Sequence, residues 1–374
     1  MRVLIVGGYG RFGGRLIRLL ADEPRLTLLA AGRSESRARA FCAGLESRAT
    51  LLPWRFDRGG DLDAQLAAAA PELLVDASGP FQAYGARPWR LVEACVAARI
   101  PYLDLADGAD FVAGVASCDA AARAADVFVL SGVSTCPTIT AAAVRRLTAG
   151  WRAVHSIAAG IAPTPWAGLG ESVLRAIAAY AGRPVTLVRD GRTATGRALV
   201  ETRRFEIALP GARPLRNTRF SLVETPELRL LPSLWPELRD IWMGAGPSPE
   251  ILHRLLNGLA WLVSVRALPS LVPLAPLFHA IVNSIRWGEH RGGMVVAVTG
   301  EDAAGRPARR SWRLIAEGDD GPFIPSTPAE VLIRGLLEGR RPAPGARPCT
   351  GELDLEDLER AFAGRAIRTG VRED

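Results

Sequence analysis

Four glycines near the start of the chain have the spacing of a phosphate-binding turn. Residues 3–14 read VLIVGGYGRFGG, so a short apolar run leads into a glycine-rich segment and then into residues with helical apolar spacing. Strand, glycine turn and helix in this order are typical of dinucleotide binding, because the phosphates lie on free N–H groups at the helix N-terminus. The residues that we expect around the pyrophosphate are Gly7, Gly8, Tyr9, Gly10, Arg11, Phe12 and Gly13.

The end of the second apolar run indicates which dinucleotide is bound. Residues 26–31 are followed by Gly32, Arg33 and Ser34, and no carboxylate stands at this point. An acidic residue here would bind the ribose 2′-hydroxyl of NAD, whereas an arginine suits the 2′-phosphate of NADP. We therefore expect NADP. The alternative is an ordinary arginine-rich helix face.

Composition excludes several kinds of chemistry. The chain has 374 residues and a net charge of +7, and all 46 of its basic residues are arginine. Without lysine there is no pyridoxal Schiff base, no P-loop lysine and no tyrosine–lysine dyad. The arginines form no basic block, which argues against nucleic acid as a partner.

The cysteines and histidines give no sign of a metal site. The five cysteines are scattered with no C-x-x-C, the four histidines form no zinc motif, and no secretory signal is evident. We expect reduced thiols, a cytoplasmic location and no bound metal.

Apolar runs alternate with helical patterns through the first third of the chain. Buried strands separated by helices predict a doubly wound parallel sheet, whose ligands bind beyond the carboxyl ends of the strands. The expected strands are 3–6, 26–31, 51–57, 72–77, 101–106 and 127–131, and the expected helices are 11–20, 61–70, 85–99 and 111–125.

The pattern changes after a helix expected at 138–149. Later strands at 155–162, 202–209, 294–299 and 309–316 predict an α+β domain with a mostly antiparallel sheet. We expect turns at 291–293 and 300–306, a helix at 329–337, a linker at 339–348 and a last helix at 353–362. The apolar stretch 251–285 is interrupted by prolines, so we expect a buried helical pair, a dimer face or a substrate wall rather than a membrane contact.

Three residues could exchange a proton or contact the substrate. Asp107 follows the expected fifth strand, with the alternative that it caps the next helix. Cys136 lies in the loop after the sixth strand, with the alternative that it packs as a small apolar side chain. Tyr84 could donate a proton, or it could pack as an aromatic residue after the Gly-Pro turn.

Together these residues resemble the saccharopine dehydrogenase-like family, of the NADP-binding saccharopine reductase type. The resemblance extends over nearly the whole chain and is carried by GGYGRFG at 7–13, AGRS at 31–34, DASGPFQAYG at 76–85, VEACVAARIPYLDLADG at 92–108, SGVSTCP at 131–137, AYAGRPVTLVRDG at 179–191 and GPFIPSTPAEVL at 321–332.

The resemblance implies a Rossmann domain at 1–136, a substrate and dimerisation domain at 137–320, and a segment at 321–374 that returns to the first domain. It implies NADP(H), hydride transfer to or from a carbon–nitrogen bond, and frequent homodimers. It places Arg33 and Ser34 at the 2′-phosphate and Asp57 at the adenine amino group. It also places Ser78, Gly79 and Pro80 near the nicotinamide ribose, and Asp107 and Cys136 where nicotinamide and substrate meet.

The leading hypothesis is an NADP(H)-dependent oxidoreductase acting on an imine, a secondary amine or a related C=X bond of a small molecule. One alternative is a regulator or scaffold that binds NADPH without turnover. Another is a membrane-surface reductase of an apolar substrate, through residues 251–285.

Overall fold

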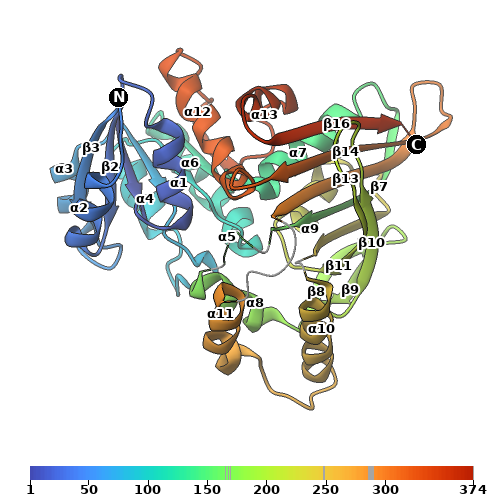
Figure 1. The fold of residues 1–374 in the computed structure, drawn as a ribbon. Helices are drawn as coiled ribbons and strands as arrows, with labels where there is room; N and C mark the ends of the chain where they lie inside the picture. The colour runs from blue at the N-terminus through green and yellow to red at the C-terminus, as the bar shows by residue number, and fades with distance from the viewer. Residues whose placement is uncertain (165, 167, 169, 247–248, 285–289, 374) are drawn as a thin grey trace. The chain divides into compact units, whose positions relative to one another are not determined.

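The computed structural model describes residues 1–373 except 165, 167, 169, 247–248 and 285–289, and it describes the side chains of neither 171–173 nor 217. The chain divides into two compact units, which are described separately (Figure 1). Unit 1 comprises Met1–Ile139 and Phe323–Leu353, and unit 2 comprises Thr140–Pro322 and Asp354–Asp374.

Unit 1 is built on a seven-stranded parallel sheet in the order β15-β6-β5-β4-β1-β2-β3. Its strands are β1 (Arg2–Val6), β2 (Thr27–Gly32), β3 (Thr50–Arg55), β4 (Leu73–Asp76), β5 (Tyr102–Asp104), β6 (Phe128–Ser131) and β15 (Gly345–Pro348). Its α-helices are α1 (Arg11–Leu20), α2 (Glu35–Ala43), α3 (Leu62–Ala69), α4 (Arg90–Ala97), α5 (Ala109–Gly114), α6 (Asp119–Ala124) and α12 (Thr327–Leu337). Short helical turns are η1 (Phe81–Ala83), η2 (Val115–Cys118) and η3 (Thr135–Ile139), and η6 (Gly321–Ser326) begins in unit 2 and ends in unit 1.

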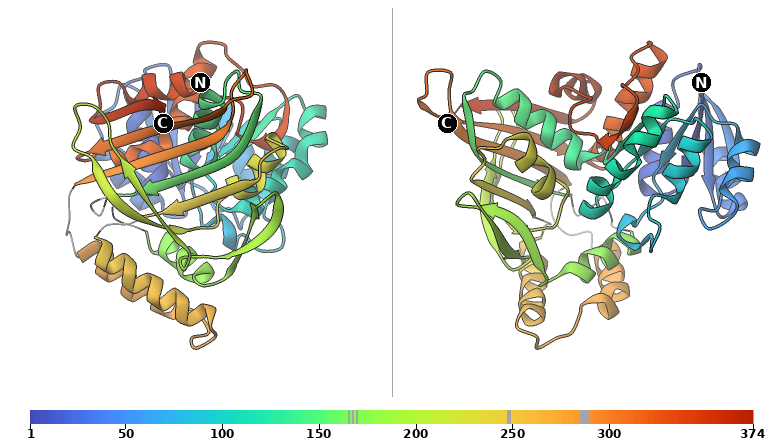
Figure 2. Two further views of the ribbon diagram at one scale, coloured as in Figure 1. Left: turned by 90° about the vertical axis from the view of Figure 1, so that its right-hand side faces the viewer. Right: turned by 180° about the vertical axis from the view of Figure 1, so that it is seen from behind.

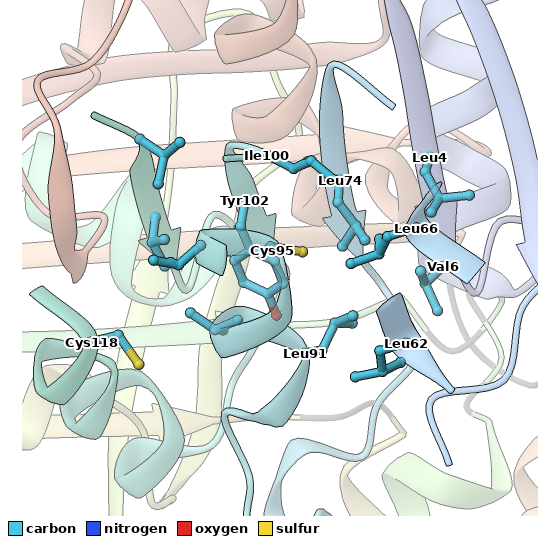
Figure 3. Close-up of a cluster of buried hydrophobic side chains, with 14 of the residues drawn as sticks. Leu4, Val6, Leu62, Leu66, Leu74, Leu91, Cys95, Ile100, Tyr102 and Cys118 are labelled. Atoms are coloured by element: carbon cyan, nitrogen blue, oxygen red, sulfur yellow. The ribbon is translucent and has the colours of Figure 1, made fainter. Parts of the chain in front are cut away.

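The central strands are buried on both faces, as expected for a parallel sheet covered by helices. Val3, Leu4 and Ile5 of β1 have no exposed surface. On one face, side chains from β1, β4 and β5 meet side chains from α3 and α4, with Leu4, Leu74 and Leu66 pointing toward one another (Figure 3). This confirms the expected doubly wound α/β architecture of the first part of the chain.

Unit 2 contains a second seven-stranded sheet in the order β10-β11-β12-β7-β13-β14-β16, in which only β12 and β7 run parallel. Its strands are β7 (Ala153–Ala162), β10 (Thr202–Ile207), β11 (Leu215–Leu222), β12 (Asp240–Ala245), β13 (Arg291–Glu301), β14 (Pro307–Glu317) and β16 (Ile367–Glu373), beside a hairpin of β8 (Pro184–Arg189) and β9 (Arg192–Arg197). Its helices are α7 (Thr140–Leu147), α8 (Glu171–Tyr180), α9 (Glu227–Leu234), α10 (Glu250–Ser264), the short η5 (Val272–Leu274), α11 (Ala275–Ser284) and α13 (Leu355–Phe362). The mostly antiparallel sheet is as expected.

Several expected elements were wrong in type or extent. The helix expected at 85–99 is shorter, because α4 spans only Arg90–Ala97. The helix expected at 111–125 is broken into α5, η2 and α6. The Trp89 indole N–H donates to the Phe111 carbonyl of α5 at 3.1 Å. The ring lies against Gly114, where a Cβ would be 2.6 Å from the Trp89 Cη2 atom.

Residues 291–293 do not form a turn but begin β13. A Cβ on Gly292 would lie 2.8 Å from the Ala162 carbonyl oxygen, and one on Gly293 would lie 2.8 Å from that of Leu314. These glycines therefore allow neighbouring strands to approach closely and do not form a turn.

The C-terminal part also differs from expectation. The expected linker 339–348 ends in β15, which pairs with β6. Residues 354–374 belong to unit 2, because β16 pairs with β14. Over the stretch 251–285 the structure has α10, η5 and α11 up to Ser284. Among the described residues, no helix is long and apolar enough to cross a membrane.

We predict that Gly13→Ala destabilises unit 1. The new Cβ would lie 2.8 Å from the Gly7 carbonyl carbon, and its nearest neighbours are backbone atoms, so no side chain can yield. Gly258→Ala in α10 is the control, because nothing lies within 4 Å of the position that its new methyl group would take. The control should gain roughly 0.5–1 kcal/mol of unfolding free energy from helix propensity. Urea denaturation measures both, and equal stability of the two variants would contradict the prediction.

Candidate active site

The glycine turn brings Gly7, Gly8, Gly10 and Gly13 together. The N–H groups of Gly7 and Gly8 donate to the Ala31 carbonyl at 2.8 and 3.0 Å, and Gly10 donates to the Gly7 carbonyl at 2.8 Å. Gly7 has a φ of +80°, which favours glycine. α1 begins directly after the turn, and Gly10 supplies no capping side chain. The first N–H groups of α1 are therefore arranged as an anion site.

Tyr9 joins the glycine turn to the tip of β2. Its hydroxyl accepts a hydrogen bond from the Ser34 N–H at 2.9 Å. Its ring lies where a Cβ on Gly32 would be, 2.6 Å from the Tyr9 Cζ atom. The Arg37 guanidinium carbon lies 5.2 Å from the centre of the ring. Sequence reasoning named Tyr9 only as a member of the turn and did not find this bridging contact.

Arg33 and Arg37 are both exposed beside the start of α2. Ser34 caps that helix, with its hydroxyl accepting from the Arg37 N–H at 3.4 Å. Glu35 forms an ion pair with Arg39, one turn further along the helix. The tip of β2 thus combines two cations, a serine hydroxyl and a helix N-terminus, a set of donors suited to a phosphate.

Asp57 lies in the loop after β3 and is exposed. Its Oδ1 accepts from the Gly59 N–H at 2.9 Å, and its own N–H donates to the Gln65 Oε1 at 2.7 Å. Arg90 holds the same loop by donating to the carbonyls of Arg58 and Gly60 at 3.2 and 2.7 Å. Asp57 therefore shapes a tight loop at the carboxyl edge of the sheet.

A buried polar network continues from this loop to the segment 78–84. The Ser78 hydroxyl donates to the Asp76 Oδ1 at 2.6 Å and lies 3.0 Å from the Tyr84 hydroxyl. Because the serine proton is directed to Asp76, Tyr84 is the donor to Ser78. Arg58 completes the network, with its guanidinium carbon 3.4 Å from the centre of the Tyr84 ring and its Nε 3.5 Å from the Asp76 Oδ2.

Tyr84 packs as an aromatic residue, which is one of the two roles considered for it. Its ring packs against Phe81 and Phe111 at centroid distances of 5.0 and 5.7 Å. Burial, together with the nearby Asp76 carboxylate, raises the pKa of Tyr84 well above its ordinary value. The hydroxyl therefore remains protonated at neutral pH and acts as a hydrogen-bond donor.

Asp107 is exposed and accepts a hydrogen bond from the Gln82 Nε2 at 3.1 Å. The expected alternative, a helix cap, is not what the structure shows. α5 begins at Ala109 with Gly108 as its cap residue and no capping side chain. Gln82 comes from the same short helix, η1, that precedes Tyr84, so Asp107 and Tyr84 lie on adjoining segments.

Cys136 is half-buried in η3, and the peptide bond that joins it to Pro137 is cis. The returning segment fixes this region, because the Ser134 hydroxyl donates to the Pro325 carbonyl at 3.0 Å. The hydroxyl of Ser326 in turn donates to the Phe12 carbonyl at 3.0 Å. The segment around 325 therefore connects the Cys136 loop with the start of α1. Gly79 and Pro80 share the other cis peptide bond of the described chain.

Asp104 fixes the two loops that carry Asp107 and Cys136. Its Oδ1 accepts from the Ala106 N–H at 3.0 Å, the Ser131 hydroxyl at 3.0 Å and the Gly132 N–H at 2.8 Å. Its Oδ2 is buried and has no hydrogen-bond partner among the described residues. Burial raises the pKa of Asp104 to about 7.

Sequence reasoning missed Arg58, Asp76 and Arg90. An aspartate that ends a buried strand, followed by Ser-Gly-Pro, is a signal that could have identified Asp76. Arg58 and Arg90 carry no comparable signal, because nothing in the sequence relates them to residue 84. No group of three or more His, Cys, Asp or Glu residues in the described part of the chain is arranged to hold a metal ion.

We predict that Asp104 makes stability fall as pH rises. The pKa of Asp104 in the folded state, about 7, lies above the ordinary value of 3.8. The contribution of Asp104 to the free energy of unfolding is therefore fully present below about pH 4. It is lost as pH rises through 7, at up to about 1.4 kcal/mol per pH unit.

Asp104→Asn, which mimics the protonated acid, should remove this part of the pH dependence. Urea denaturation of both proteins between pH 5 and 8 measures it. If the unfolding free energies of the two proteins changed with pH in the same way, Asp104 would not titrate in this range.

Comparison with known proteins shows the fold. A scan against protein-family models finds no match, and neither does a search of curated proteins. Among solved structures, the chain is similar to apo saccharopine dehydrogenase (L-Glu forming) from Saccharomyces cerevisiae, with 13% identity, 99% of each chain covered and a TM-score of 0.66.

Weaker similarities are found to a probable dehydrogenase from Thermotoga maritima and to the WlbA dehydrogenase from Thermus thermophilus in complex with NAD and UDP-GlcNAcA. The first has 10% identity, a TM-score of 0.42 and coverage of 97% of this chain and 93% of the other. The second has 12% identity, a TM-score of 0.40 and coverage of 96% and 93%. The chain therefore has the fold of saccharopine dehydrogenase, with a Rossmann-like parallel sheet and a mixed second sheet.

Proposed function

We propose that this protein is an NADP(H)-dependent oxidoreductase that transfers a hydride to or from an imine, a secondary amine or a related C=X bond of a small molecule. The observation that carries the proposal is that Tyr9 joins the glycine turn to the segment of Ser34 and Arg37, next to Arg33. The fold of saccharopine dehydrogenase supports the same reaction class. A homodimer and a cytoplasmic location complete the proposal.

The residues of the turn fit a dinucleotide. Side chains at Gly7 and Gly13 would collide with backbone, so the main chain stays bare where a pyrophosphate would approach. The start of α1 has no acidic residue and no capping side chain, which leaves its N–H groups for the phosphates. Arg33, Ser34 and Arg37 would hold the 2′-phosphate, with Tyr9 fixing the distance between the two loops.

When bound, the nicotinamide supplies or accepts the hydride. Residues of unit 1 hold or accept the proton that accompanies hydride transfer. Tyr84 holds a proton on its hydroxyl oxygen, and Ser78 connects that oxygen to Asp76. Arg58 stabilises the Asp76 carboxylate, so that Ser78 keeps donating to it. Asp107, which is exposed and held by the Gln82 amide, can accept a proton from the substrate or bind its amine.

We predict that NADPH binds about tenfold or more tightly than NADH, which is a difference of roughly 1.4 kcal/mol. Arg33→Ala should remove this preference, because a guanidinium binds the 2′-phosphate and makes no comparable bond to a 2′-hydroxyl. Arg39→Ala is the matched control, since Arg39 lies on the neighbouring helix but is paired with Glu35. Fluorescence titration of the reduced cofactors measures both affinities. Equal binding of the two cofactors by the unaltered protein would overturn the NADP assignment.

We also predict turnover that depends on Tyr84. Loss of NADPH absorbance with a panel of imines should identify a substrate, and Tyr84→Phe should lower kcat by up to about tenfold, the scale of one lost hydrogen bond, because Ser78 no longer accepts from the Tyr84 hydroxyl. The packing against Phe81 and Phe111 is kept in this variant. Tyr180→Phe in unit 2 is the control. NADPH binding without turnover of any member of the panel would favour the alternative of a regulator or scaffold.

A further inference from the structure

Unit 2 contains a cavity of about 340 Å³ that takes no part in the proposed dinucleotide site. It is lined by residues of β10, β13, β14 and β16. β10 is not next to β13 in the strand order, so the sheet must curl for these strands to share a cavity. The left view of Figure 2 looks onto this sheet.

Arginine hydrogen bonds fasten the connection between β10 and β11 over the sheet. Arg313 of β14 donates to the Ala208 carbonyl at 3.5 Å, and Arg368 of β16 donates to that of Gly211 at 2.6 Å. Arg291 of β13 donates to the Arg213 carbonyl. Side chains from β13, β14 and β16 thus bind the connection between β10 and β11. This connection follows β10, which lines one side of the cavity.

The strand register places three arginines around one serine. Arg309, Ser311 and Arg313 alternate along β14 and therefore point to the same face. Arg372 of β16 is the direct register partner of Ser311. Paired Cβ atoms in an antiparallel sheet lie about 5 Å apart, and diagonal neighbours about 7–8 Å. The three arginines are consequently neighbours of Ser311 on the same face of the sheet.

Charge on the walls of the cavity is strongly unbalanced. The lining contains the four arginines Arg204, Arg309, Arg313 and Arg372 and one carboxylate, Glu206. Arg204 forms a two-point ion pair with Glu250, at 2.6 and 3.2 Å. Arg313 is only 8% exposed. The residues that line the cavity therefore include more basic than acidic side chains, which favours an anionic ligand.

We propose that this cavity, which we name the β14 arginine site (Arg309, Ser311, Arg313 and Arg372), binds a small organic or inorganic anion with two or more phosphate or carboxylate charges. Each guanidinium has five N–H donors in a planar fork, so it can bond to the chain and still bind an oxyanion in a bidentate manner. The volume is in the range of small-molecule sites. Val295 and Ala297 add an apolar floor that suits the carbon frame of an organic anion.

A second copy of the chain is the less favoured occupant. The chain carries a net charge of +7, and the site itself is basic. Two copies that met through this face would bring like charges together without a compensating acidic surface from the lining residues. A small anion, by contrast, has a charge opposite to that of the arginines that line the cavity.

Calorimetric titration with pyrophosphate and with citrate, at fixed ionic strength and with saturating NADP⁺ present, tests the proposal. NADP⁺ prevents pyrophosphate from binding at the glycine turn. The double variant Arg309→Gln/Arg372→Gln removes two exposed arginines of the site and leaves buried Arg313 in place. The control Arg192→Gln/Arg306→Gln removes the same net charge from β9 and from the turn between β13 and β14.

We expect one saturable site per chain, an affinity about tenfold or more lower in the double variant, and an affinity within about twofold of the original in the control. Binding of pyrophosphate alone would identify phosphate as the ligand group, and binding of citrate alone would identify carboxylate. The absence of saturable binding, or equal loss in both double variants, would overturn the proposal. Sedimentation measures the oligomeric state of the Arg309→Gln/Arg372→Gln variant. If the protein binds no anion and this variant changes from dimer to monomer, the proposal is overturned in favour of a second copy. NADP⁺ binding is measured separately, so a lack of anion binding at the β14 arginine site would not bear on the proposed function.

Discussion

The buried carboxylates at the ends of β4 and β5 fix the geometry on which the candidate site depends. Asp76 and Asp104 are register partners on neighbouring strands, and neither has exposed surface. Asp104 binds the backbone of two loops. Asp76 binds Ser78 and Arg58 from two others, and Ser78 in turn binds Tyr84. A buried carboxyl group is costly unless it is hydrogen-bonded, so the loops and the two aspartates stabilise one another. The same bonds hold the residues named for catalysis at one edge of the sheet.

Much of unit 1 could be predicted from the sequence because its signals are local. The run VLIV followed by spaced glycines determines β1, the turn and α1, and Arg33 stands where the tip of β2 must lie. Tyr84, Asp107 and Cys136 were found because each follows a strand. Their partners were not found, since Arg58 reaches Tyr84 through a loop and helix packing across 26 residues of chain. Periodicity contains no information about contacts of this kind.

Unit 2 was predicted less completely, for a physical reason. β9 is mostly exposed and β11 is interrupted by arginines, so their alternation is weak. β15 reads Gly-Ala-Arg-Pro and has no intrinsic strand preference; it forms because β6 offers an unpaired edge. In the same way, β16 exists because β14 offers an edge. Where tertiary pairing decides the local structure, a single sequence cannot show it.

The pairing of β15 with β6 has a consequence for synthesis on the ribosome. The first sheet lacks its last strand until residues 345–348 have been translated, which is after nearly all of unit 2. During that interval the edge of β6 presents unpaired backbone groups, a known template for pairing with other chains. Elongation of the intervening two hundred residues or so takes on the order of ten seconds or more. The nascent first unit must therefore persist for that time with an open edge, a demand for chaperone protection that an uninterrupted domain would not make.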